Sequence, residues 1–350
     1  MAERYLELTF DDRREVLDVA ASASGRPAYL LEKDIWVVWS LETLFAGPLG
    51  APLVFKGGTS LSKAYGAIRR FSEDIDLSYD IRALAPELVR DHPDALPPSR
   101  SQEKRWTKAV GRALSTWLHE VAAPTLARSL QVVEPGGKVA VEGGDVVIRY
   151  AALQEGTDYG RPEVKLEFGG RATGEPNAAM GVRCDAADHV PGVEFPTAKP
   201  RVLQAERTFW EKATAAHVYC VQRRGRGDGF ARHWHDLVRL DESGVVTSAL
   251  ADRRIAEEVA AHKAAFFRAK DASGNWVDYG AAVTGGLRLV PAGGALSALA
   301  DDYARMVEGG WLLDEAEPFG VLMDACRAIE DRANRTGRPR ACGPGTGPSL

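Results

Sequence analysis

The feature that most constrains the fold of this chain is a glycine pair followed by two alternating aspartates. The glycines stand in the segment Lys56–Ser60, directly after the apolar run 52–55. Further along, Asp74 and Asp76 alternate with apolar residues. In a strand, two carboxylates spaced this way point to one face, and the apolar residues point to the other. We therefore expect a strand, a turn, a helix and a second strand, with the start of the helix and both carboxylates at one end of a sheet.

The residue types in this arrangement favour phosphate chemistry. Two neighbouring carboxylates repel each other unless a cation lies between them, and Mg²⁺ prefers oxygen ligands, so Asp74 and Asp76 are candidate metal ligands. A Gly-Gly-Thr-Ser turn offers backbone N–H groups and opens onto a helix N-terminus, which favours anions. The candidate phosphate-binding residues of the turn are Gly57, Gly58, Thr59 and Ser60. A triphosphate held over metal-binding carboxylates indicates nucleotidyl transfer. A capped turn beside an exposed strand is the structural alternative.

A second alternating segment supplies a third candidate carboxylate. In 163–168, the residues Glu163, Lys165 and Glu167 share one face of the expected strand. Glu167 lies nearer the strand end and could complete a metal site or act as a general base. A solvent-facing strand with self-pairing charges is the alternative.

Two motifs in the second half of the chain also carry charge. Lys212, flanked by small residues on an expected helix, has room to reach a phosphate, although charge on a helix is more often simply solvated. Asp236 closes the segment Arg232–Asp236, whose His233 and His235 lack a third metal ligand at useful spacing and are interpreted as surface or packing residues.

The composition excludes several classes of protein. With 350 residues, 45% of them hydrophobic and 27% charged, the chain can form two domains. No run approaches the roughly 20 apolar residues of a membrane span, and no apolar signal segment opens the chain, so we expect a cytoplasmic protein without membrane contact. The four widely spaced cysteines indicate reduced thiols. A net charge of −5 argues against a protein that coats nucleic acid.

A local basic patch is still compatible with this charge. It comprises Arg223, Arg224 and Arg226, with Arg232 just beyond. It is either a site for RNA backbone or a solvated loop.

The periodicity predicts an α+β protein with a small mixed sheet flanked by helices and a C-terminal helical domain. Strands are expected at 53–55, 74–79, 130–133, 145–150 and 163–168. Helices are expected at 11–22, 28–46, from Thr59 or Ser60 as a cap, and at 102–130, 236–240, 253–268, 295–306 and 319–333. Residues 84–100 are interpreted as a loop and 191–200 as a linker. The expected domains are 1–198 and 199–333, followed by a disordered tail at 334–350.

These motifs, taken together, resemble the AbiEii/AbiGii-type nucleotidyltransferase toxins of the DNA polymerase β-like superfamily. The resemblance is carried, over almost the full length, by Glu32–Asp34, Lys56–Ser60, Arg70–Leu77, Lys165–Gly169, Glu206–Lys212, Arg232–Leu237, Asp302–Met306 and the helix after Pro318. The interval from Gly58 to Asp74 is longer than in many polymerase β-like enzymes but suits this family.

The resemblance implies an N-terminal nucleotidyltransferase fold and particular roles for several residues. Asp74 and Asp76 would bind Mg²⁺, Lys63 would lie with the glycine turn on the phosphate-binding side, and Lys212 and Asp236 would be essential. Glu167 has no clear mark in the family pattern. The resemblance also implies a toxin of a bacterial toxin–antitoxin or phage-defence pair, with a cognate antitoxin as partner. Relatives transfer nucleotides from an NTP, some of them to the 3′ end of tRNA.

Three alternatives remain open from the sequence. A nucleotidyltransferase acting on a small molecule or a protein would use the same first half of the chain. A kinase-like phosphotransferase would move the γ-phosphoryl group instead. A non-catalytic interaction protein is disfavoured because Asp74 and Asp76 are both present.

Overall fold

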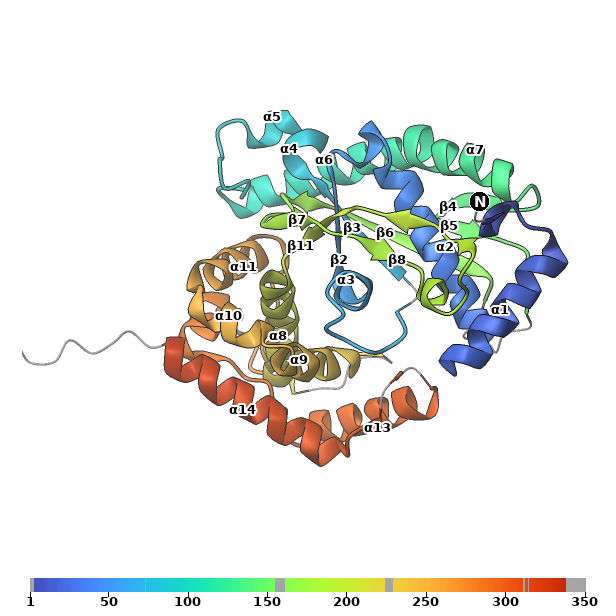
Figure 1. Ribbon diagram of the computed structural model, residues 1–350. Coiled ribbons are helices and arrows are strands. Elements are labelled where there is room, and N and C mark those ends of the chain that lie inside the picture. Colours follow the sequence, from blue (N-terminus) through green and yellow to red (C-terminus); the bar gives the residue numbers. More distant parts are fainter. Residues whose placement is uncertain are drawn as a thin grey trace, which may run out of the picture. The chain divides into compact units, whose positions relative to one another are not determined.

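The computed structural model describes residues 3–72, 74–154, 161–223, 229–310, 312–313 and 315–337 (Figure 1). The chain divides into two compact units, Met1–Thr208 with Trp311–Asp314, and Phe209–Gly310 with Glu315–Leu350. The expected domain boundary, between residues 198 and 199, lies ten residues before this division.

A mixed sheet forms the centre of the first unit. Its seven strands within the described residues follow the order β4-β5-β6-β3-β2-β11-β7. The pairs β3/β6 and β2/β11 are parallel, and the others are antiparallel. The bounds are β2 Leu53–Lys56, β3 Asp74–Asp80, β4 Lys138–Glu142, β5 Asp145–Arg149, β6 Glu163–Ala172, β7 Asn177–Ala179 and β11 Arg201–Leu203. Two small pairs accompany it, β1 Glu3–Arg4 with β9 Val193–Glu194, and β8 Val182–Arg183 with β10 Thr197–Ala198.

Helices flank this sheet. They are α1 Phe10–Ser24, α2 Ala28–Phe45, α3 Gly57–Lys63, α4 Ile81–Leu84, α5 Pro86–Val89, α6 Arg100–Trp117 and α7 Ala123–Val133. A π-helical turn, Leu118–Ala122, joins α6 to α7. Figure 1 shows α6 and α7 along one side of the sheet and α3 on the other.

The alternation expected for β3 is confirmed and divides the sheet into two different faces. Ile75 and Leu77 are fully buried in the core, whereas Asp74 and Asp76 on the opposite face are partly exposed. Trp117 of α6 packs edge-on against Tyr79 and Phe168, so this helix covers the apolar face. The carboxylate face is thereby left for polar groups.

The second unit is built from helices in the described part of the chain. α8 Ala205–Gln222 begins in the first unit and continues into the second. The others are α9 Arg232–Glu242, α10 Val245–Ala251, α11 Arg253–Phe266, α12 Tyr279–Ala281, α13 Gly294–Glu308 and α14 Phe319–Gly337. Trp210 and Trp234 are its largest fully buried side chains. Among all described helices of the chain, none is both long and apolar enough to cross a membrane.

Several sequence-based expectations were wrong in detail. Residues 130–133 end α7 rather than forming a strand, because Leu126 and Leu130, one helical turn apart, are both buried while Val132 is 82% exposed. The strand that follows, β4, was missed. The loop 84–100 contains α5, and the linker 191–200 contains β9 and β10, since two-residue strands leave no periodic pattern.

The C-terminus also differs from the expectation. Residues 334–337 belong to α14 rather than to a disordered tail, and 338–350 lie outside the described residues. Three of the cysteines, Cys184, Cys220 and Cys326, are buried free thiols, as expected.

Candidate functional site

The glycine turn is in contact with the aspartate strand at Gly57. α3 begins at this residue, directly after β2. Gly57 has φ of 78°, a left-handed conformation that residues with a Cβ rarely adopt. A Cβ atom here would also lie 2.0 Å from Oδ2 of Asp76. Only glycine therefore lets the turn approach this carboxylate so closely.

Gly58 makes the second close approach, to the segment just before β3. A Cβ atom on Gly58 would lie 2.5 Å from Nη2 of Arg70 and 3.1 Å from Oγ of Ser72. Arg70 is only 3% exposed. In the sequence this arginine was part of the motif without a role of its own. Its burial against the glycine turn identifies it as a residue that shapes the site.

The hydroxyl groups of Thr59 and Ser60 form hydrogen bonds with other residues of the same motif. Oγ1 of Thr59 lies 2.8 Å from Oγ of Ser72 and also contacts the backbone carbonyl of Asp74. Ser60 donates from Oγ to the carbonyl of Gly57 at 2.9 Å. Both side chains are buried, so a phosphate contact by these residues would come from backbone N–H groups. Neither residue caps α3, contrary to the expectation, since the helix starts at Gly57.

The register across three strands places the candidate carboxylates in one row. Asp76 lies opposite Lys56 on β2 and opposite Glu167 on β6. Register partners on adjacent strands share a face and lie about 4.8 Å apart. The structure thus brings Glu167 next to Asp76. Glu167 also forms an ion pair with Lys165, which contacts Asp145 at 3.0 Å.

The carboxylates offer limited ligation to a metal. Within the described residues, there is no group of three or more His, Cys, Asp or Glu side chains placed to hold one metal ion. Asp74 and Asp76 alone could supply two oxygen ligands. This set fits Mg²⁺, which keeps several waters and is bound by one or two carboxylates together with substrate phosphates.

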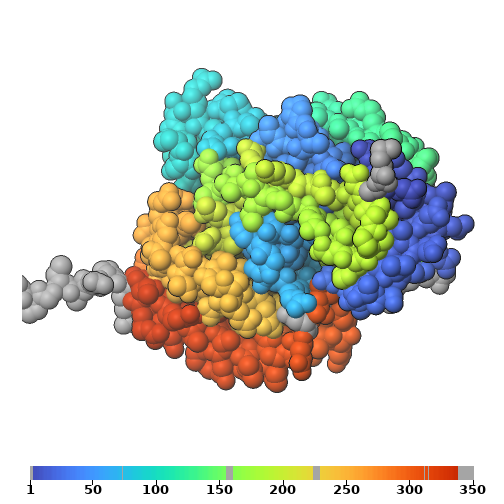
Figure 2. Space-filling model, in the orientation of Figure 1, coloured from blue at the N-terminus to red at the C-terminus, as the bar shows by residue number. Residues whose placement is uncertain are grey.

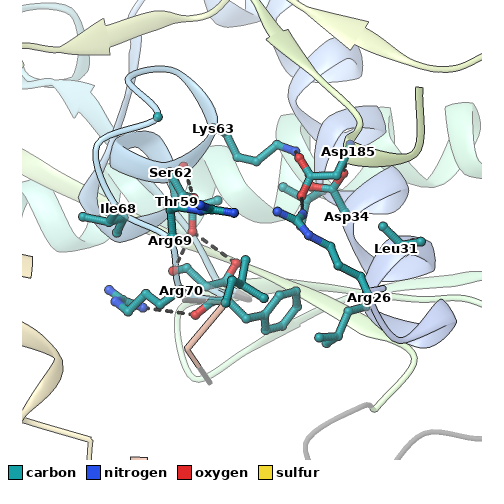
Figure 3. A pocket seen from close by; sticks show the side chains of 16 residues that line it. Arg26, Leu31, Asp34, Thr59, Ser62, Lys63, Ile68, Arg69, Arg70 and Asp185 are labelled. Atoms are coloured by element: carbon teal, nitrogen blue, oxygen red, sulfur yellow. Dashed lines mark hydrogen bonds and ion pairs between the residues drawn. The ribbon is translucent and has the colours of Figure 1, made fainter. Parts of the chain in front are cut away.

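Lys63, the remaining phosphate-binding candidate in this unit, is held by two carboxylates. Its Nζ lies 2.6 Å from Oδ1 of Asp34 and 2.7 Å from Oδ1 of Asp185 (Figure 3). Arg26 pairs with Asp185 as well. Burial alone would lower the pKa of Lys63, but the two carboxylates outweigh it and raise the pKa. Lys63 is therefore a charged centre of a buried network, and contact with a nucleotide stays a prediction.

The second unit contains its own buried ion pair. Nζ of Lys212 on α8 lies 2.8 Å from Oδ2 of Asp236 on α9, with side-chain exposures of 9% and 0%. His235 is fully buried beside it, as expected for a packing residue. From the residues alone, Lys212 was one possible phosphate contact, and only the resemblance marked both Lys212 and Asp236 as essential. Their pairing follows from the packing of two helices and could not be read from periodicity.

Asp302 is a residue of the second unit that the sequence left without a role. Its carboxylate accepts hydrogen bonds from the backbone N–H groups of Gly229, at 2.7 Å, and Ala231, at 2.6 Å. These groups immediately precede α9, so Asp302 fixes the start of the helix that carries Asp236. Of the basic patch, Arg223 is exposed at the end of α8 and Arg232 begins α9, whereas Arg224 and Arg226 lie outside the described residues.

Comparison with known protein families decides the class of the chain. The family described as "Nucleotidyl transferase AbiEii toxin, Type IV TA system" matches residues 39–324. The chain belongs to the AbiEii family. The match spans most of the sequence and includes the glycine turn, both aspartates, Glu167, Lys212 and Asp236. As a member of the AbiEii family, the chain is a nucleotidyltransferase of the toxin type, from a system that pairs a toxin with an antitoxin.

A solved structure gives a more distant likeness. The crystal structure of JHP933 from Helicobacter pylori is 14% identical to this AbiEii chain, with 89% of this chain and 93% of that one covered and a TM-score of 0.39. No curated protein matches the chain.

Proposed function

We propose that this AbiEii toxin transfers a nucleoside monophosphate from an NTP to the 3′ end of tRNA and releases pyrophosphate. The observation that carries the proposal is the contact between Gly57 and Asp76. It joins a turn with unobstructed backbone amides to a carboxylate suited to a metal. In the reaction, the acceptor hydroxyl oxygen bonds to the α-phosphorus, and the bond to the β-phosphate oxygen breaks.

The proposed fold is a nucleotidyltransferase domain in the first unit with a helical domain in the second. The mixed sheet with Asp74 and Asp76 on a central strand supports the first part. The helices from α9 to α14 support the second.

The carboxylates and the glycine turn of the first unit have separate tasks in this proposal. Asp74 and Asp76 would hold Mg²⁺, which supplies charge stabilisation to phosphoryl oxygens when bound. The backbone amides of the Gly57–Ser60 turn would orient the triphosphate. Glu167, the neighbour of Asp76, is proposed to position or deprotonate the acceptor hydroxyl. Its ion pair with Lys165 keeps its carboxylate on this face.

Lys212 and Asp236 are proposed to act as a pair. Lys212 would neutralise phosphate charge that grows in the transition state. The 2.8 Å ion pair and the complete burial of Asp236 support a positioning role for the aspartate, which would hold the ammonium group in one orientation.

The tRNA acceptor is proposed from the sequence resemblance rather than from the geometry, and the partner is proposed from the family. An RNA acceptor would meet the exposed side chains of Arg223, after α8, and Arg232, at the start of α9. The type IV description implies a separately encoded antitoxin.

The test is a labelling experiment on the full chain. The protein is incubated with Mg²⁺, each of four α-³²P-labelled NTPs and total bacterial RNA. We expect label in a tRNA-sized band with at least one NTP. Label found only in protein or in small molecules would show that the acceptor is not tRNA. The absence of any label would contradict nucleotidyl transfer.

Matched variants decide whether the assigned site is responsible. Asp76→Asn should abolish labelling while the thermal unfolding midpoint stays close to that of the wild type. Asp91→Asn makes the same change at an exposed position of the first unit and should label normally. Equal labelling by both variants would show that the metal site is elsewhere.

A further inference from the structure

A cavity of about 250 Å³ lies in the first unit, beside the glycine turn (Figure 3). It is bounded by the N-terminal half of α2, by α3 and by the loop that leads to β3. Figure 2 shows the α3 segment, in mid-blue, reaching the surface of this unit beside the yellow-green segments. The α3 helix, which forms one wall of the cavity, also carries the glycine turn of the candidate site.

The polar wall of the cavity has an excess of positive charge. The charged residues among the described lining are Arg26, Lys63, Arg69, Arg70, Asp34 and Asp185. Four cations thus face two carboxylates. Figure 3 shows Arg26 and Arg69 extending into the cavity from different elements. Arg69 is exposed, whereas Arg26 pairs with Asp185 and Lys63 is fixed between Asp34 and Asp185. Such a surplus of guanidinium groups favours a phosphate.

The remaining wall is apolar. It is formed by Leu30, Leu31, Val37, Ile68, Phe71 and Leu313. An apolar surface facing guanidinium groups suits a ligand that has a flat, weakly polar part and an anionic part. A nucleotide has both, in its base and its phosphate. The cavity is smaller than the roughly 300–1,000 Å³ of sites for drug-sized ligands, so it matches one nucleotide unit rather than a whole NTP.

Two lining residues connect the cavity to the aspartate strand β3. Thr59 and Ser72 both line the cavity, and their hydroxyl groups lie 2.8 Å apart. Thr59 also contacts the backbone carbonyl of Asp74. A ligand in the cavity would therefore lie one side chain away from the backbone that carries the candidate metal ligands.

We infer that this cavity binds a single nucleoside monophosphate unit, with the base on the apolar wall and the phosphate on Arg26 and Arg69. This inference rests on the proposed function, because it assigns a subsite to the nucleotide chemistry proposed above. The unit comes either from a free nucleotide or from the 3′-terminal nucleotide of an RNA.

The test measures binding to the full chain without Mg²⁺, in the Asp76→Asn background, so that transfer does not contribute. The probes are the four nucleoside 5′-monophosphates and a short single-stranded RNA with a free 3′ end, in calorimetry. We expect saturable binding of at least one probe. Arg69→Gln should weaken it about tenfold, as the loss of a charged hydrogen bond implies. Leu30→Trp, which fills the cavity, should weaken it as well.

The control is Arg14→Gln, which removes the same charge from an exposed position on α1 and should leave binding unchanged. Tighter binding of the monophosphates would identify a free nucleotide as the source, and tighter binding of the RNA would identify the 3′ end. No binding of any probe would overturn the inference, and so would equal losses in the Arg69 and Arg14 variants. Binding here with no labelling in the transfer assay would contradict the proposed function alone.

Discussion

At the scale of single residues, the contact between Gly57 and Asp76 has the clearest chemical consequence. The sequence analysis explained the glycines of this turn by the phosphate, which reaches backbone N–H groups more easily where no Cβ atom obstructs them. The structure adds a second cause, since the carboxylate itself occupies the place of a Cβ atom. Arg70 could not be predicted in the same way, because its burial depends on where the loop after α3 folds back.

Gly57→Ala should therefore remove transfer activity and destabilise the first unit by more than about 1 kcal/mol. The substitution adds backbone strain and a clash with Asp76. Gly25→Ala provides the control, because Gly25 has a similar φ of 72° with no atom within 4 Å of its Cβ position. Chemical denaturation and the labelling assay, run on both variants, separate clash from strain. If the two substitutions changed stability and labelling equally, the role of the contact between Gly57 and Asp76 would be contradicted.

Lys63→Met tests whether this lysine is structural. Removing the cation leaves Asp34 buried without its ion pair, which should cost about 3–5 kcal/mol of unfolding free energy. The double variant Lys63→Met/Asp34→Asn should recover most of that loss, because the amide oxygen still accepts the hydrogen bond from the N–H of Asp185. Urea denaturation of the wild type, the single variant and the double variant measures the loss and its recovery. A large loss of activity with unchanged stability would instead indicate direct phosphate contact.

Glu32 predicts a pH dependence of stability. Burial raises its pKa to about 7, against an ordinary value of 4.5, while the N–H of Leu153 donates to its carboxylate. The folded protein thus holds this proton more tightly than the unfolded chain. The stability from this group is complete below pH 4.5 and is lost as the pH rises to about 7, by roughly 3 kcal/mol at most.

Glu32→Gln removes this titration. The unfolding free energy of the variant, relative to the wild type, should therefore increase between pH 4.5 and 7. Denaturation at a series of pH values measures the difference. A constant difference across that range would show that Glu32 has an ordinary pKa.

At the scale of elements, β3 and its neighbours β2 and β6 were all predictable as strands, but the register between them was not. The alternation of aspartates with Ile75 and Leu77 sets both the strand and its two faces. That Glu167 lies opposite Asp76 depends on register, which no local pattern encodes. For the short, mostly apolar run 130–133, even the type of element was not predictable, because such a run suits a strand and a helix end equally well.

The start of α9 gives a prediction at this scale. Asp302→Ala leaves two backbone N–H groups before α9 without their carboxylate, which should destabilise the second unit by about 1–3 kcal/mol and lower activity through Asp236. Asp301→Ala changes an exposed neighbour and should have little effect. Thermal unfolding and labelling compare the two. Equal stability of both variants would exclude the capping role.

At the scale of the whole molecule, the candidate residues are divided between the two units. The carboxylate strand and the glycine turn belong to the first, and the pair Lys212–Asp236 belongs to the second. Motif order along the chain was enough to predict the family, which the match to residues 39–324 shows. The contacts of Lys63, Arg70 and Asp302 could not be predicted from the sequence. Lys63 and Asp302 contact residues far away in sequence, and the burial of Arg70 depends on the path of a loop.

The measurement that tests the central claim most directly identifies the by-product of the reaction. The full chain is incubated with tRNA, Mg²⁺ and a γ-³²P-labelled NTP, beside Asp76→Asn, and the products are separated by thin-layer chromatography. Nucleotidyl transfer predicts labelled pyrophosphate from the wild type and none from the variant. Label transferred to the acceptor, with unlabelled nucleoside diphosphate released, would instead show phosphoryl transfer and contradict the account.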